Sequence, residues 1–149
     1  MTLNIATIVS SFAALVISGV KVCDTDHIPV QVTDRDCPIL FPEPLGFVTD
    51  FTVIRDSWGA PSVAKKTATY TLHYTFCYMP VGAARELERY GDMVETAFAI
   101  LDAVILNEDL AGALEFDPAG AMEFGPVPDP AGNLFLGCRF AFLVTEFIN

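Results

Sequence analysis

The sequence predicts one α+β domain: a single mixed or antiparallel sheet of about four to five strands, two long helices packed on one face of it, and proline-rich extended loops. Residues 67–79 alternate between two kinds of side chain with the period of a strand. Residues 83–106 instead place apolar side chains three and four positions apart, which is typical of a helix. At 149 residues and 52% hydrophobic content, the chain can bury one core.

The first predicted element is a helix within residues 3–20. Polar residues interrupt this apolar stretch and its first basic residue, Lys21, follows it. We therefore expect a core or interface helix rather than a signal peptide or a membrane anchor. Gly19 is expected to end the helix. The apolar face consists of Ile5, Ile8, Val9, Phe12 and Val16.

A proline-rich region follows over residues 23–66. Alternation at 27–33 predicts a short edge strand, and the prolines within 37–44 predict an irregular extended arm. Residues 47–54 alternate again and are predicted as a strand. The remaining stretch, 55–66, is predicted as a long loop of the kind that often carries function.

The strongest strand and helix signals come next. In the strand at 67–79, Tyr70, Leu72, Tyr74, Phe76 and Tyr78 share one face, which we expect to be core. In the helix at 83–106, a glycine at position 91 favours a kink. The apolar stripe expected to pack on the sheet is Leu87, Tyr90, Val94, Phe98, Leu101 and Ile105.

The C-terminal third is predicted to be strand, loop and strand. Residues 114–116 and 121–124 are short strand candidates, and 125–132 is a turn-rich connection. Residues 134–148 form the longest strand candidate, whose last third is nearly all apolar, as expected of a doubly covered strand.

The charge is acidic and uneven. The formal net charge is -11, which excludes a general nucleic-acid binder because such a protein needs a basic footprint on phosphate. Residues 90–138 contain acidic side chains and no Lys or Arg. We expect this acidic block to face water, to repel an anionic molecule or to meet a basic partner.

Motifs for catalysis or metal binding are weak. The dense polar cluster Asp24, Asp26, His27, Asp34 and Asp36 lacks the glycine of an EF-hand, so a solvated loop is favoured over a cation site. His73 lies within a strand and is expected to be structural. The four cysteines, Cys23, Cys37, Cys77 and Cys138, have no metal-site spacing and are expected to be buried or half-buried thiols.

The order of elements and several local strings resemble the tail terminator proteins of long-tailed bacteriophages. The resemblance covers most of the chain as a pattern of elements. The strings are the apolar N-terminal helix, the proline-rich segment 38–47, the loop Asp56-Ser-Trp-Gly59, the strand Tyr70-Thr-Leu-His-Tyr-Thr-Phe76, the helix end Asp102-Ala-Val-Ile-Leu-Asn107 with Leu110 after it, and the final strand over 137–146.

This resemblance implies a subunit of a hexameric ring that caps the growing tail tube, stops its polymerisation and joins the tail to the head. The implied partners are further copies of the chain, the tail tube protein and the head–tail connector or neck protein. Genomic DNA would pass through without specific binding. The implied location is the tail–neck region of the virion, after assembly in the host cytoplasm, with no membrane, no cofactor, no metal and no catalytic residues.

Contact residues can be hypothesised on this basis. Phe41 and Trp58 are candidate interface residues, with packing of Trp58 back onto its own domain as the alternative. Lys65 with Lys66 would meet the acidic block of a neighbouring copy. The channel or an adjoining ring face is expected to be lined by some of six acidic residues: Asp102, Glu108, Asp109, Glu115, Asp117 and Glu123.

Two other functions stay open. The protein could be another neck, head-completion or tail structural protein of the same assembly, because fold does not determine function. It could also be a small cytoplasmic ligand-binding or acid–base enzyme, with polar residues converging in a pocket between helix and sheet. The residues of that pocket would be Asp24, Asp26, His27 and His73.

Overall fold

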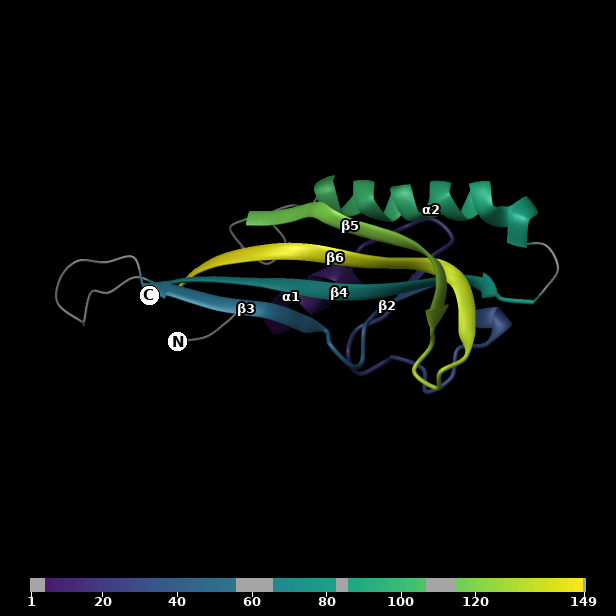
Figure 1. Ribbon diagram of the computed structural model, residues 1–149, viewed down its shortest axis with the longest axis horizontal. Coiled ribbons are helices and arrows are strands. Elements are labelled where there is room, and N and C mark those ends of the chain that lie inside the picture. The colour runs from purple at the N-terminus through teal and green to yellow at the C-terminus, as the bar shows by residue number, and fades with distance from the viewer. Residues whose placement is uncertain (1–4, 56–65, 83–85, 107–114, 149) are drawn as a thin grey trace.

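The structure is a computed structural model, and it describes residues 5–55, 66–82, 86–106 and 115–148. It confirms an α+β architecture: the described part of the chain forms a mixed sheet and two α-helices (Figure 1). The helices and strands are α1 (Ile5–Ala13), β1 (Lys21–Val22), β2 (Ile39–Pro42), β3 (Val48–Arg55), β4 (Lys66–Pro80), α2 (Glu86–Leu106), β5 (Glu115–Pro128) and β6 (Leu134–Ile148), with a 3-10 turn at Asp34–Asp36.

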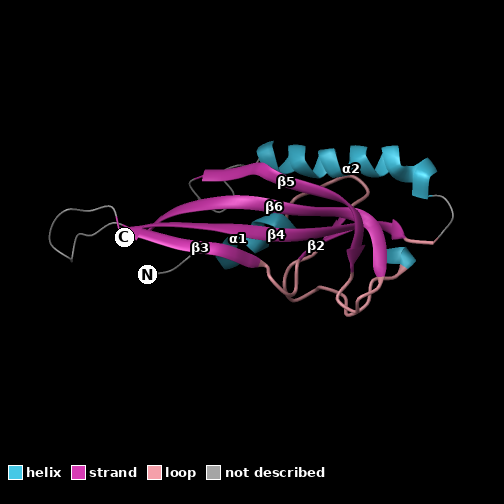
Figure 2. Ribbon diagram, in the orientation of Figure 1, coloured by secondary structure: helices cyan, strands magenta, loops and turns pink. Residues whose placement is uncertain are grey.

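The sheet is built around β4. Five of its six strands run in the order β1-β2-β4-β6-β5. The sixth, β3, pairs with β4 on the same side as β2. β1 and β2 are parallel and every other pair is antiparallel. Figure 2 shows that β3, β4 and β6 form a long ribbon, one end of which continues beyond both helices. β3 and β5 therefore lie at opposite edges of the sheet.

The gap between β2 and β3 lies opposite His73. The backbone N–H of Glu43 donates to the carbonyl oxygen of His73 at 3.0 Å, and the N–H of His73 donates to the carbonyl oxygen of Phe47 at 2.9 Å. These two bonds satisfy the backbone of β4 where no strand pairs with it on this side. The loop 43–47 thus stays against the sheet.

The main core lies on one face of the sheet and includes both helices. The ring of Phe12 from α1 stacks on Tyr74 of β4, with centroids 4.5 Å apart. From α2, Met93 and Ile100 enter the same cluster and are fully buried. Each large apolar side chain buried in this way contributes about 1.5–3 kcal/mol. The predicted core face of β4 is confirmed: Tyr70, Leu72, Tyr74, Phe76 and Tyr78 are all buried.

A smaller core cluster lies on the opposite face, at one end of the sheet. Ile39 and Phe41 of β2 pack there with Cys77 of β4 and Phe135 of β6. Asp129 holds Val32 in this cluster, because its Oδ2 accepts a hydrogen bond from the backbone N–H of Val32 at 3.0 Å. The predicted burial of Cys77 and Cys138 is confirmed, Cys23 is also buried, and Cys37 is half-buried; all four are free thiols.

Several boundaries differ from the sequence prediction. The N-terminal helix ends at Ala13, so Val16 is 96% exposed rather than part of the apolar face. Gly19, with φ of 76°, makes the turn of an isolated bridge between Ile17 and Val20 instead of closing a helix. The chain reverses there, which allows the following residues to reach β2 as the parallel strand β1.

The proline-rich region also differs from prediction. Residues 27–33 contain no strand, whereas the stretch predicted to be irregular contains β2. Pro42 is tolerated at the last position of β2, a strand end where a missing donor costs little. The two short strands predicted between 114 and 124 are one strand, β5, with an irregular register between Asp117 and Ala121. The helix α2 continues through Gly91 without interruption.

Candidate assembly surfaces

The predicted interface residues fall in different environments. Phe41 is fully buried in the smaller core cluster, so its side chain is not available to a partner, and its assignment as a contact residue conflicts with this burial. Phe41 pairs directly with Thr75 of β4, so the two side chains lie on the same face of the sheet, which is the face of the smaller cluster. Trp58 and Lys65 lie outside the described residues. Lys66 is half-buried at the first position of β4.

The predicted acidic face is divided between two sides of the sheet. Asp102 is exposed on α2, which packs on the main-core face. Glu123 is exposed on β5 and pairs directly with Arg139, whose strand position alternates with the core residues Cys138 and Phe140. Asp102 and Glu123 therefore cannot line the same surface of one subunit. Glu108 and Asp109 lie outside the described residues, as do the side chains of Glu115 and Asp117.

The apolar stripe predicted to face the core is largely exposed. Leu87 is 91% exposed and Phe98 is 51% exposed, whereas Val94 and Leu101 are half-buried. The prediction is wrong for Leu87, Tyr90, Phe98 and Ile105, which are exposed, whereas Val94 and Leu101 pack against the core as expected. The helix α2 is apolar on two adjacent sides, and the core takes mainly the other one. The side chains that enter the core are Met93, Ala97, Ile100 and Val104.

This side, which is exposed except at the half-buried Val94 and Leu101, is termed the α2 stripe: Leu87, Tyr90, Val94, Phe98, Leu101 and Ile105. One helical turn is 3.6 residues, so each member lies within about 40° of the stripe's centre, and the core-facing side chains lie about 90° away. An apolar surface wider than the usual stripe of about 100° was the signal in the sequence that part of α2 would stay exposed.

A row of acidic side chains borders the α2 stripe on its solvent side. Glu88, Glu95 and Asp102 follow one another at intervals of seven residues and are exposed. Within the described part of the chain, none of these three carboxylates is paired with a cation. These residues are termed the acidic row.

Arg89 is the basic side chain described on α2. Its Nη2 donates to the hydroxyl of Tyr78 at 3.0 Å, and its guanidinium lies 5.7 Å from the centre of that ring. Its Nε lies 3.5 Å from a carboxylate oxygen of Asp92. The hydrogen bond to Tyr78 and the neighbouring Asp92 raise the pKa of Arg89 above its ordinary value. Arg89 therefore fastens the start of α2 to the end of β4 and leaves the acidic row uncompensated.

A second exposed apolar surface lies at the opposite edge of the sheet. Val53 of β3 is 51% exposed and pairs with Ala68, so it points to the main-core face. Phe51 points the same way, because its ring stacks on Tyr70 with centroids 5.4 Å apart. Arg55 pairs directly with Lys66 on this face. These four residues, Phe51, Val53, Arg55 and Lys66, are termed the β3 patch.

The helix-free face of the sheet carries a polar network. Nε and Nη2 of Arg139 lie 2.9 and 2.8 Å from Oε2 of Glu43. His73 lies next to this pair, and Oγ1 of Thr49 and Nε2 of His73 share a hydrogen bond of 2.7 Å. Nδ1 of His73 has no partner among the described residues. A histidine held in a strand by such contacts fits the structural role expected from the sequence.

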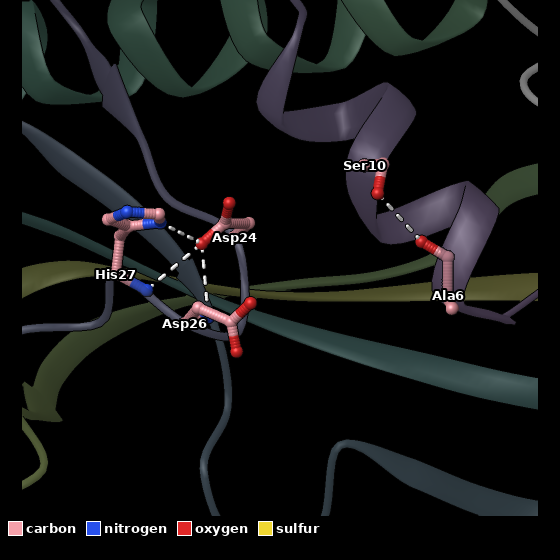
Figure 3. Close-up of polar contacts among 5 residues, drawn as sticks. All are labelled: Ala6, Ser10, Asp24, Asp26 and His27. Carbon is pink, nitrogen blue, oxygen red and sulfur yellow. Dashed lines mark hydrogen bonds and ion pairs between the residues drawn. The ribbon is translucent and has the colours of Figure 1, made fainter.

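The aspartate cluster forms turns. Oδ1 of Asp24 accepts the backbone N–H groups of Asp26 and His27 at 3.0 and 2.9 Å and lies 2.6 Å from Nδ1 of His27 (Figure 3). The hydrogen bond from the His27 side chain is the main cause that lowers the pKa of Asp24. Asp36 likewise accepts the backbone N–H of Thr33 at 2.8 Å. Across the described ranges, no group of three His, Cys, Asp or Glu side chains is placed to hold a metal ion.

The four polar residues of the hypothetical enzyme pocket do not converge. A hollow beside Asp24 and Asp26 is lined by residues of α1 and by Phe47, and His73 does not line it. His73 belongs to the opposite face of β4, because its neighbours Leu72 and Tyr74 point into the main core. Ser10 also lines the hollow, and its hydroxyl donates a hydrogen bond of 3.1 Å to the carbonyl oxygen of Ala6 within α1 (Figure 3).

Comparison with known proteins gives no assignment: no protein-family model matches the chain, and no curated protein matches it significantly. Neither of the helices in the described ranges is long and apolar enough to cross a membrane. The residues themselves therefore carry the functional argument, above all the two exposed apolar surfaces.

Proposed function

We propose that the protein is a structural subunit of a bacteriophage virion, a tail terminator. Copies of it form a ring, hexameric by the resemblance of its elements to that family. The ring caps the tail tube, stops its polymerisation and joins the tail to the head–neck connector. Its partners are other copies of itself, the tail tube protein and the connector, and it acts in the tail–neck region of the virion after assembly in the host cytoplasm.

The observation that carries this proposal is the pair of unlike apolar surfaces at opposite edges of the sheet. Helix α2, which carries the stripe, lies on the side of β5, and strand β3, which carries the patch, lies at the other edge of the sheet (Figure 1). Two different surfaces on opposite sides of one subunit favour head-to-tail contacts between copies, and such contacts generate a ring when the rotation closes. A monomeric protein gains nothing from leaving this apolar area in water.

The charge supports passage of DNA through such a ring. The net charge of -11 opposes phosphate binding, and the exposed Asp102 and Glu123 give acidic character to both faces of the sheet. In such a ring we place an acidic surface of the subunit, rather than the basic end at Arg55 and Lys66, at the channel. An acidic lumen lets DNA pass without holding it.

The proposal is tested by the mass of the purified protein in solution and by electron microscopy of the particles. A ring with a central hole, located by antibody labelling at the head-proximal end of the tail tube, is the expected result. Labelling of the connector alone would favour the related reading, another neck or head-completion protein. A stable monomer at millimolar concentration, absent from virions, would contradict the structural role and favour the enzyme alternative.

A further inference from the structure

The C-terminal part of the α2 stripe matches the β3 patch in length, and the acidic row beside the stripe is opposite in charge to Arg55 and Lys66 of the patch. At 1.5 Å per residue the whole stripe extends over about 27 Å of helix, and its part from Val94 to Ile105 extends over about 16 Å. Phe51 to Arg55 extends over about 13 Å of strand, at 3.3 Å per residue. The C-terminal part of the stripe is therefore long enough to cover the β3 patch when the helix lies along the edge strand.

The basic end of the β3 patch is unusual in this acidic chain. Arg55 and Lys66 are directly opposite each other in the ladder, and like charges in that position destabilise a strand pair. Within the described ranges neither side chain has an acidic partner. An anionic group from outside the subunit would relieve this repulsion.

The edge of β3 itself also lacks cover. Among the described strands β3 pairs only with β4, and its apolar side chains Phe51 and Val53 are exposed. Exposed apolar edge strands favour association with another chain. The same applies to the α2 stripe, whose aromatic members Tyr90 and Phe98 are 40% and 51% exposed on a helix of 21 residues.

We propose that the α2 stripe of one copy docks on the β3 patch of a second copy, with the acidic row facing Arg55 and Lys66. This inference rests on the proposed ring function and names the contact that repeats around the ring. The occupant is a second copy because one chain carries both complementary halves on opposite edges, where they cannot meet within one molecule (Figure 1). The apolar side chains supply area, and the charges fix orientation.

The decisive experiment mixes two blocked variants. Phe98→Glu blocks the α2 stripe and leaves the β3 patch intact, and Val53→Glu does the reverse. Each variant alone is expected to be monomeric in analytical ultracentrifugation, and an equimolar mixture is expected to give a 1:1 heterodimer that grows no further. Val30→Glu is the matched control, because Val30 is 85% exposed and belongs to neither surface; it is expected to assemble like the wild type.

A charge-reversal pair tests the orientation. Arg55→Glu is expected to weaken self-association at least tenfold, and a second change in the same chain, Asp102→Lys, is expected to recover most of the loss. Raising the salt concentration is expected to weaken wild-type association and to reduce this difference, since exposed charges are screened beyond about 8 Å at physiological ionic strength. Circular dichroism of each variant establishes that it is folded.

The other outcomes overturn the inference in distinguishable ways. If Val53→Glu assembles like the wild type while Phe98→Glu does not, the helices pair with each other; the docking proposal then fails while the ring proposal stands. The same holds if the mixture gives no heterodimer. If the wild type never associates, the ring function fails together with this contact.

Discussion

The hydroxyl of Thr49 and Nε2 of His73 lie 2.7 Å apart, which joins β3 to β4 just where the backbone ladder of β4 passes from β3 to β2. Burial of the imidazole is the main cause that lowers the pKa of His73, and the neighbouring Arg139 lowers it further. Glu43, Asp50 and Glu123 act in the opposite direction without reversing the shift. The folded protein therefore favours the neutral imidazole.

The first prediction follows from this shift. Because the pKa of His73 is lower in the folded than in the unfolded chain, the unfolded state binds more protons as the pH falls below about 6.5. The stability that neutral His73 contributes is present above that pH and decreases below it. His73→Gln is expected to show less loss of unfolding free energy between pH 7.5 and 5.5 than the wild type, measured by urea denaturation.

Proton NMR supplies an independent check on the same residue. The chain has two histidines, so the imidazole signal that disappears in His73→Gln belongs to His73. We expect that signal to titrate below pH 6.5. Titration at or above 6.5 would contradict the neutral, buried imidazole.

The second prediction concerns Gly137, where the backbone of β4 leaves no room for a side chain. A Cβ at this position would lie 1.8 Å from the carbonyl oxygen of Phe76. Gly137→Ala is expected to lower the free energy of unfolding by about 2–3 kcal/mol or more, because the strands must separate locally. The measurement is chemical denaturation followed by circular dichroism.

Gly91 gives a matched control for that substitution. A Cβ there meets no atom within 4 Å, and the residue lies inside α2. Gly91→Ala is expected to raise the free energy of unfolding by about 0.5–1 kcal/mol, since alanine is the better helix former. Equal effects of the two substitutions would be inconsistent with the register of β4 and β6.

The sequence was sufficient for elements with one strong period and insufficient where two forces compete. The strands β4 and β6 follow directly from alternation and apolar content. In α2 the period predicts a helix, but two apolar sides compete for the core, and only the packing of Met93 and Ile100 on the sheet decides between them. Likewise, prolines made Ile39–Pro42 look irregular, although pairing with β4 and burial of Phe41 stabilise it as a strand.

The candidate surfaces depended on the same distinction. The acidic row and the α2 stripe are readable from the sequence as residues, but their exposure is a tertiary property. The β3 patch needed the register, because Arg55 and Lys66 become neighbours only when β3 pairs with β4. In the sequence, Asp24 and Asp36 belong to a cluster of charged residues. In the structure, their carboxylates accept hydrogen bonds from nearby backbone N–H groups and so stabilise turns.

The third prediction concerns Asp129, whose Oδ2 accepts a hydrogen bond from the backbone N–H of Val32, 97 positions earlier in the chain. Its other oxygen accepts the backbone N–H of Asn133 at 2.7 Å in the turn between β5 and β6. Burial alone would raise the pKa of Asp129, but the hydrogen bonds from Val32 and Asn133 outweigh it and lower the pKa below its ordinary value. Asp129→Ala is expected to cost about 1–3 kcal/mol at pH 7.

The pH dependence of that loss has a defined sign. With the folded pKa of Asp129 lowered, its contribution is fully present above the ordinary aspartate pKa of about 3.9 and decreases as the pH falls through the folded value. The difference between wild type and Asp129→Ala should therefore shrink from pH 7 to pH 3. Asp26→Ala, on an exposed turn, is the control and should change stability by less than about 0.5 kcal/mol at pH 7. A pH-independent difference would argue against the ionised carboxylate as the cause.

The fourth prediction separates the two apolar sides of α2 within one helix. Ile100 is fully buried in the main core and Phe98, two residues earlier, is 51% exposed. Ile100→Ala is expected to lower the unfolding free energy by about 2–5 kcal/mol, because it leaves a cavity. Phe98→Ala is expected to change it by less than about 1 kcal/mol in dilute solution, where the chain is monomeric, because little buried area is lost and alanine favours the helix.

At concentrations where copies associate, the two substitutions should differ in another way. Phe98→Ala should abolish the concentration dependence of the melting temperature, whereas Ile100→Ala should lower that temperature and retain the dependence. A large loss of monomer stability in Phe98→Ala would place this side chain in the core and remove the α2 stripe as a contact surface.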